Sequence, residues 1–196
     1  MSQPISQHEK IRQITLGSVF IAISLVLGIT KIGFIPLPLP TLAGTIFHIP
    51  VILAGMLLNP FIGLVCGLIF GVTALMAYPQ FPWFVMIPGR LVIPIVSYLV
   101  FHGLMLLLKT VRSIHLKLSI AGLITGALGS VTNSACTLGL AYIFRVFGKT
   151  GPENWKVIVT IIPVAFVEMV LACILVPSLI IPLYLYFNPK AKQENQ

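Results

Sequence analysis

Two charged residues lie inside long hydrophobic runs, and their chemistry is the main clue to what this chain does. Glu168 is the only charged residue between positions 158 and 187, and Arg90 is the only one between positions 88 and 108. An ionisable side chain at membrane depth costs about 2.5–3.5 kcal/mol on insertion scales, so it usually faces a cavity lined by protein or water. Two such residues of opposite sign predict a polar pocket.

Each of the two charges has a structural and a functional interpretation. A guanidinium that faces the pocket would bind a carboxylate or phosphate through two parallel hydrogen bonds. Arg90 follows Pro88 by two residues, so it should lie just inside the outer end of its helix, from where it could instead extend to the lipid headgroups. Glu168 comes 11 residues after position 157 and has a shorter side chain than arginine, so it cannot easily reach the headgroups. Its remaining interpretations are a ligand contact and a structural ion pair or hydrogen bond to another helix.

Uncharged polar side chains in other runs add further candidates for the same pocket. Thr132 and Asn133 lie near the middle of an apolar run, where the amide of Asn133 could bind an uncharged polar ligand or join two helices. His48 begins another run directly after a proline-rich segment, as a packed residue or as a ligand contact. Together with the two charges, Asn133 and His48 predict a binding site that opens outwards.

The composition is that of a membrane protein. Apolar residues make up 58% of the chain, charged residues only 8%, and the mean hydropathy is +1.06, whereas soluble domains carry about 25% charge. The 196 residues therefore predict one transmembrane substrate-binding domain, with short cytoplasmic tails at about 1–10 and 188–196. The net charge of +8 comes from basic residues in short loops and tails, which indicates membrane topology rather than nucleic-acid binding.

Six apolar runs predict an all-α, compact bundle of six transmembrane helices. The runs are at about 11–30, 46–58, 61–77, 88–108, 118–147 and 157–187. A spanning helix needs about 20 residues, so the second and third runs should form a tight hairpin around Asn59-Pro60. The last run should kink at its prolines, which are Pro163, Pro177 and Pro182.

The distribution of lysine and arginine predicts the orientation. With six spans both termini share one side, and that side holds seven basic residues against four on the other. This excess predicts a multi-pass protein of the cell membrane with both termini in the cytoplasm. The seven are Lys10, Arg12, Lys109, Arg112, Lys117, Lys190 and Lys192, and the four are Lys31, Arg145, Lys149 and Lys156.

Two outward loops are distinctive. Residues 31–45 contain Pro36, Pro38 and Pro40, which favour a stiff extended conformation. Residues 78–87 read YPQFPWFVMI, and Trp83 within them is either an anchor at the membrane interface or part of a lid that contacts the substrate. In the second interpretation both loops fold over the outer mouth of the cavity.

The first run carries small residues that suit helix docking. Ser18 and Ala22 are four residues apart with Gly17 beside them, a spacing that lets another helix approach closely in lipid. If this helix lies at the edge of the bundle, the face predicts a contact with another membrane protein.

Catalytic sequence motifs are missing, which favours binding or transport over catalysis. Gly148-Lys149-Thr150 ends like a phosphate-binding loop, but Ile143 stands where its first glycine is required. Without HExxH, GxSxG or paired aspartates we predict no enzyme, no cofactor and no metal. Two alternatives stay open, a self-sufficient ion-coupled transporter with Glu168 as proton carrier and an intramembrane enzyme acting on lipid. No inverted repeat supports the first of them.

Several segments resemble the substrate-binding S components of energy-coupling factor (ECF) vitamin transporters. They are GSVTNSACTLGLAYIF at 129–144, IPVAFVEMVLACILVPSLI at 162–180, FHIPVILAGMLLNPFIGLVCGLIFG at 47–71, and the Pro-Gly-Arg that opens the run at 88. The resemblance implies six helices with both termini inside and a water-soluble vitamin bound beneath the first loops. It also implies a transmembrane scaffold subunit and two cytoplasmic ATPase subunits as partners, besides membrane lipids.

The resemblance also assigns roles to particular residues. Arg90, Asn133 and Glu168 become candidate ligand contacts, with His48 as a further one. The family's Ala-xxx-Ala-like docking face on the first helix corresponds here to Ser18 and Ala22. Residues 47–71 are most similar to the pantothenate-type subgroup, in which an arginine would suit the vitamin's carboxylate. Cobalamin or another water-soluble vitamin would use the same architecture with a wider mouth.

Overall fold

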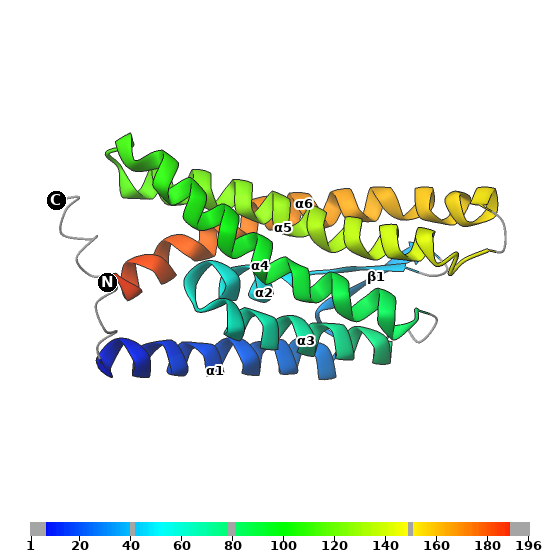
Figure 1. The fold of residues 1–196 in the computed structure, drawn as a ribbon, viewed down its shortest axis with the longest axis horizontal. Coiled ribbons are helices and arrows are strands. Elements are labelled where there is room, and N and C mark those ends of the chain that lie inside the picture. The colour runs from blue at the N-terminus through cyan, green and yellow to red at the C-terminus, as the bar shows by residue number, and fades with distance from the viewer. Residues whose placement is uncertain (1–6, 40–41, 78–80, 149–150, 189–196) are drawn as a thin grey trace.

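The described part of the chain folds into six α-helices with a β-hairpin between the first two (Figure 1). The computed structural model describes residues 7–39, 42–77, 81–148 and 151–188. A short 3-10 turn, η1, follows the fourth helix. The elements are α1 (Gln7–Ile29), β1 (Phe34–Leu39), β2 (Leu42–Thr45), α2 (His48–Leu57), α3 (Pro60–Ala77), α4 (Trp83–Leu107), η1 (Leu108–Thr110), α5 (Ile114–Ile143) and α6 (Gly151–Phe187).

Five of the described helices are long and apolar enough to cross a membrane, so six spanning helices are not confirmed. The exception is α2, which has ten residues and is about 15 Å long at 1.5 Å per residue, half of a hydrocarbon core about 30 Å thick. All of α2 except Leu57 is buried. A half-length helix is tolerated at this depth because protein rather than lipid surrounds its ends.

Four helices begin four to six residues earlier than the sequence predicts, namely α1, α4, α5 and α6, and α5 ends four residues before the predicted position 147. α4 begins at Trp83 instead of position 88, with Pro88 inside it, so residues 83–87 are helical rather than part of an outer loop. A proline was expected at the helix start because it has no N–H to donate, but an interior proline is tolerated where a helix kinks. α6 begins at Gly151 instead of position 157, where Pro152 and Glu153 provide a favourable first turn.

The proline-rich segment after α1 is extended, as predicted, and its two halves pair as an antiparallel hairpin. Phe34 lies opposite Thr45 and Ile35 opposite Gly44. A two-stranded sheet has two free edges, so it accommodates prolines that cannot donate to a partner strand. Pro40, also predicted as part of this segment, lies outside the described residues. Because α2 begins three residues after β2 ends, the hairpin is attached directly to α2.

Glycines let the helix backbones approach closely. A Cβ atom on Gly67 of α3 would lie 2.5 Å from the carbonyl oxygen of Arg90 on α4, and one on Gly126 of α5 would lie 2.8 Å from that of Ala172 on α6. Such distances exclude any side chain larger than hydrogen without a shift of the helices. The position of α4, and with it Arg90, therefore depends on Gly67.

The helices place the hairpin toward one end of the bundle and the beginning of α1 and end of α6 at the other (Figure 1). α1 packs on α3 and runs in the same direction, with Gly17 against Ile62 and Gly28 against Thr73. α5 and α6 form a long antiparallel pair, and α4 lies between α3 and α5. β2 lies against α6, which holds the hairpin against the bundle.

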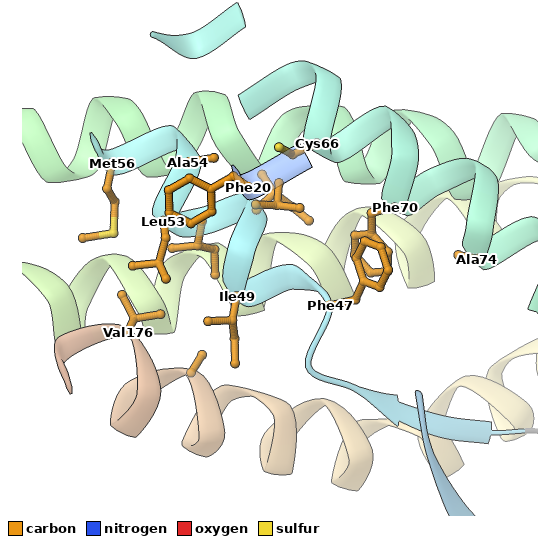
Figure 2. Close-up of a cluster of buried hydrophobic side chains, with 14 of the residues drawn as sticks. Phe20, Phe47, Ile49, Leu53, Ala54, Met56, Cys66, Phe70, Ala74 and Val176 are labelled. Carbon is orange, nitrogen blue, oxygen red and sulfur yellow. The ribbon is translucent and has the colours of Figure 1, made fainter. Parts of the chain in front are cut away.

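An aromatic stack connects the hairpin to the core. The rings of Phe34 and Phe47 have centroids 6.1 Å apart, and those of Phe47 and Phe70 are stacked at 4.6 Å. Figure 2 shows Phe47 and Phe70 facing each other where the chain leaves the hairpin and enters α2. Both rings are fully buried. The hairpin, α2 and α3 are thus joined beneath the region where the charged side chains meet.

Candidate binding site

A cavity of about 80 Å³ lies between the hairpin and helices α3 to α6. It brings together Arg90, Asn133 and Glu168, three of the residues predicted as ligand contacts, from three different helices. The other side chains that line it are Phe34, Thr45, Ala74, Phe81, Met86, Ser134, Thr137, Leu138, Ile161 and Val164. A few polar groups within an apolar wall are typical of a small-molecule site.

Arg90 faces this cavity and does not extend toward lipid headgroups. It lies seven residues into α4 and is 5% exposed. Its Nη1 donates a hydrogen bond to the hydroxyl of Thr137, and its guanidinium carbon lies 5.1 Å from the centre of the Phe70 ring. Its Nε has no hydrogen-bond partner among the described residues. The guanidinium is therefore held in place while one of its donors stays available.

Glu168 joins α6 to the hairpin from the other side of the cavity. Its side chain is 5% exposed, and Oε1 accepts a hydrogen bond from the backbone N–H of Thr45 at 2.6 Å. A hydrogen bond to a carboxylate is stronger than one between neutral groups. This bond fixes the end of β2 against α6 and orients the carboxylate toward the cavity.

Arg90 and Glu168 do not form a direct ion pair. Within the described part of the chain no nitrogen of Arg90 lies within 4.0 Å of a carboxylate oxygen of Glu168, although the two charges interact across the cavity. Each charge instead has an uncharged hydrogen-bond partner. The two charges would suit a ligand that carries an anionic group at one end and hydrogen-bond donors at the other.

α5 contributes a polar stripe, part of which the sequence analysis missed. Asn133 is 3% exposed, and its Oδ1 has no hydrogen-bond partner among the described residues. Thr137, one turn later, donates its hydroxyl to the Asn133 carbonyl at 2.8 Å and accepts from Arg90. Residues four apart share a face of a helix. The spacing from Asn133 would therefore have identified Thr137.

Three other predicted contacts lie outside the cavity wall. His48 is fully buried at the start of α2, and neither ring nitrogen has a hydrogen-bond partner among the described residues. Thr132 donates its hydroxyl to the Leu128 carbonyl at 2.7 Å on another face of α5. Trp83 is 66% exposed and packs edge-on against Phe84. Thr132 points away because it is rotated by about 100° from Asn133, whereas His48 still lies close enough to Arg90 to interact with it electrostatically.

The predicted docking residues of α1 separate onto two faces. Ser18 and Ala22 are exposed on the outside of the bundle. Gly17 is buried, and a Cβ atom there would lie 2.9 Å from the side chain of Ile62 on α3. Gly17 is therefore needed for packing within the protein, and the outer small-residue face consists of Ser18 and Ala22 without it.

Comparison with known proteins agrees with this architecture. The model of the family described as "ECF transporter, substrate-specific component" matches residues 12–187, which include the cavity and all of the helices except the first five residues of α1. No curated protein matches the chain significantly. The family and the apolar helices indicate a multi-pass membrane protein that binds a small-molecule substrate as a transporter subunit. Because the match covers most of its length, the chain belongs to the family of ECF transporter substrate-specific components.

Proposed function

We propose that this protein captures a small water-soluble vitamin from outside the cell for an ATP-driven importer, with pantothenate as the first candidate. The observation that carries the proposal is the buried, unpaired arrangement of Arg90 and Glu168 on opposite walls of one cavity. Burying two opposite charges without pairing them directly is costly, and ionisable side chains at membrane depth usually serve a ligand or a pathway.

The chemistry of the cavity favours a carboxylate that also carries hydroxyl or amide groups. Arg90 Nε, which lacks a partner among the described residues, would donate to the carboxylate. The free Oδ1 of Asn133 and the carboxylate of Glu168 would accept from hydroxyl and amide groups. Pantothenate carries all three kinds of group.

The size of the cavity separates the candidate vitamins. A volume of about 80 Å³ is well below the roughly 300–1,000 Å³ of small-molecule sites, so even a small vitamin requires the walls to open. The hairpin is the wall that would move, and the Thr45–Glu168 bond and the Phe34–Phe47 packing are described contacts that hold it against α6 and the core. Cobalamin, which is far larger than pantothenate, would require a much larger displacement.

The membrane orientation and the partners follow the family. We place both termini in the cytoplasm, the hairpin toward the outside, and the protein in the cell membrane, as the distribution of basic residues favours. A transmembrane scaffold and two ATPase subunits would supply the energy. We propose that Ser18 and Ala22, on the exposed face of α1, contact the scaffold.

Ligand titration of the purified protein tests the function. We expect native mass spectrometry and calorimetry in detergent to show one pantothenate bound without any ATPase present. Arg90→Gln should weaken binding at least tenfold, since a hydrogen bond to a charged group contributes about 1.5–3 kcal/mol. Thr160→Val is the control, because that hydroxyl is exposed on α6 and bonds only its own helix at Val157. Folded protein that binds no water-soluble vitamin would refute the proposal, and uptake without ATPase subunits would favour the ion-coupled alternative.

A further inference from the structure

A second cavity lies at the end of the bundle opposite the hairpin, and the length of α2 explains it. α2 ends after ten residues and fills only half of the bundle's interior. The last turns of α6, which contain Pro177 and Pro182, slant toward the start of α1 (Figure 1), and the guanidinium of Arg12 lies over the Phe187 ring. Space therefore remains between α1, α4, α6 and the end of α2.

This second cavity is large and polar on one side. Its volume is about 360 Å³, within the range of small-molecule sites, and none of its lining residues belongs to the first cavity. Side chains from α1, α2, α4 and the end of α6 form an apolar wall. The polar side is made by Arg12, Gln13, His102, Tyr184 and Asn188, and no acidic side chain lines the cavity among the described residues.

Arg12 is the cation of this cavity and has no anionic partner within the described part of the chain. Its guanidinium carbon lies 5.5 Å from the centre of the Phe187 ring, and it forms no ion pair or hydrogen bond with a described residue. Stacking on an aromatic face orients the guanidinium while its N–H donors, which lie in its plane, stay free for an oxyanion. The amide of Gln13 and the hydroxyl of Tyr184 line the same space and can donate further hydrogen bonds.

The position of the cavity along the membrane normal identifies the source of the oxyanion. Arg12 is the second residue of the apolar stretch of α1, which runs from Ile11 to Ile29, so its charge lies at the level of the lipid headgroups. Leu107 at the end of α4 and Tyr186 on α6 are both 78% exposed beside the cavity's helices. A headgroup in the cavity would thus have acyl chains beside an apolar surface. Basic pockets between transmembrane helices bind anionic lipid headgroups.

We propose that this second cavity binds the phosphate of an anionic phospholipid, with Arg12 as its main contact. A free phosphate presents the same oxyanion but makes no use of the apolar wall. The lipid has partners for both sides of the cavity: its phosphate oxygens contact the polar side, and its glycerol and acyl carbons contact the apolar side. It is bound independently of a substrate in the first cavity.

Native mass spectrometry of the full chain in detergent, titrated with defined probes, tests this site. The probes are dioleoylphosphatidylglycerol, dioleoylphosphatidylcholine and inorganic phosphate. We expect the anionic lipid to bind at least tenfold more tightly than the zwitterionic one, and inorganic phosphate not to compete at similar concentration. Arg12→Gln should lose about tenfold in affinity for the anionic lipid, and Arg12→Lys less. Lys109→Gln, which removes an exposed charge at the same end of α4 without touching the cavity, should leave it unchanged.

The outcomes separate the possible explanations. If Arg12→Gln fails to fold, Tyr184→Phe provides the second test, since it removes one hydroxyl from the cavity and should weaken lipid binding several-fold. Equal affinity for both lipids would overturn the proposal, because the cavity would then not recognise the anionic headgroup. Equal losses of affinity in Arg12→Gln and Lys109→Gln would also overturn it, because the binding would then be non-specific charge attraction. Competition by inorganic phosphate at the lipid's own concentration would overturn the lipid assignment in favour of a free-phosphate site.

Discussion

Gly67→Ala tests whether close packing of α3 on α4 positions Arg90. The new Cβ would lie 2.5 Å from the Arg90 carbonyl oxygen, and ordinary contact begins at 3.4 Å, so α4 would have to move by about 0.9 Å. The contact is with backbone, so a side-chain rotation cannot relieve it. Overpacking of this kind costs about 1–3 kcal/mol, and a misplacement of about 1 Å can cost about a hundredfold where geometry is critical.

Gly103→Ala is the matched control for this change. Gly103 is also a helical glycine of α4, but a Cβ atom there would meet nothing within 4 Å. The exchange lowers the backbone entropy of the unfolded chain, so it should leave the free energy of unfolding unchanged or raise it by up to about 1 kcal/mol. We expect Gly67→Ala to lower the melting temperature in detergent and to weaken pantothenate binding at least tenfold, measured by calorimetry. If Gly67→Ala melts and binds like Gly103→Ala, the close approach of the two helices does not position Arg90 and the reasoning is wrong.

Two further predictions concern single contacts. Thr137→Val should weaken ligand binding about tenfold, because the Arg90 guanidinium loses the hydroxyl that holds it in place. Thr137→Ser keeps a hydroxyl and should bind the ligand like the wild type. Calorimetry of both variants checks this prediction, and equal binding by Thr137→Val and wild type would contradict it. Ala22→Phe should reduce vitamin uptake by cells that contain the whole transporter without changing binding to the purified protein. Ile23→Phe, also on an exposed position but about 100° around α1, is its control, and a similar loss of uptake in both variants would rule out a docking face at Ala22.

The charged residues of the site could be predicted because a charge inside an apolar run has few structural explanations. Arg90 and Glu168 stand out by sequence alone, and both line the cavity. The hydroxyls were harder to assign, since serine and threonine in transmembrane helices usually bond to their own backbone, as Thr132 does. Thr137 does so as well and contacts Arg90 in addition. Only the helical spacing from Asn133 distinguishes Thr137, which lies one turn away on the same face, from Thr132.

The lengths and ends of helices could be predicted less well. Apolar runs mark where helices lie but not whether a proline begins or interrupts one, so the start of α4 was placed five residues too late at Pro88. The attachment of the hairpin to α6 includes a contact between Thr45 and Glu168, 123 residues apart in the chain. No local pattern reports such a contact. Local sequence also does not indicate that Gly17 is buried while its neighbour Ser18 is exposed. That difference depends on where α3 packs against α1.

The energetics of the cavity link folding to ligand binding. Burial of the Arg90 guanidinium is offset in part by its stacking on Phe70, about 2 kcal/mol for a desolvated pair, and by the bond to Thr137. A buried donor or acceptor without a partner costs about 1–3 kcal/mol; among the described residues Nε of Arg90 is such a donor and Oδ1 of Asn133 such an acceptor. A ligand that supplies partners to both regains this free energy on binding. Folding therefore holds the two side chains in place with their protein contacts and leaves their remaining hydrogen-bonding capacity for the substrate.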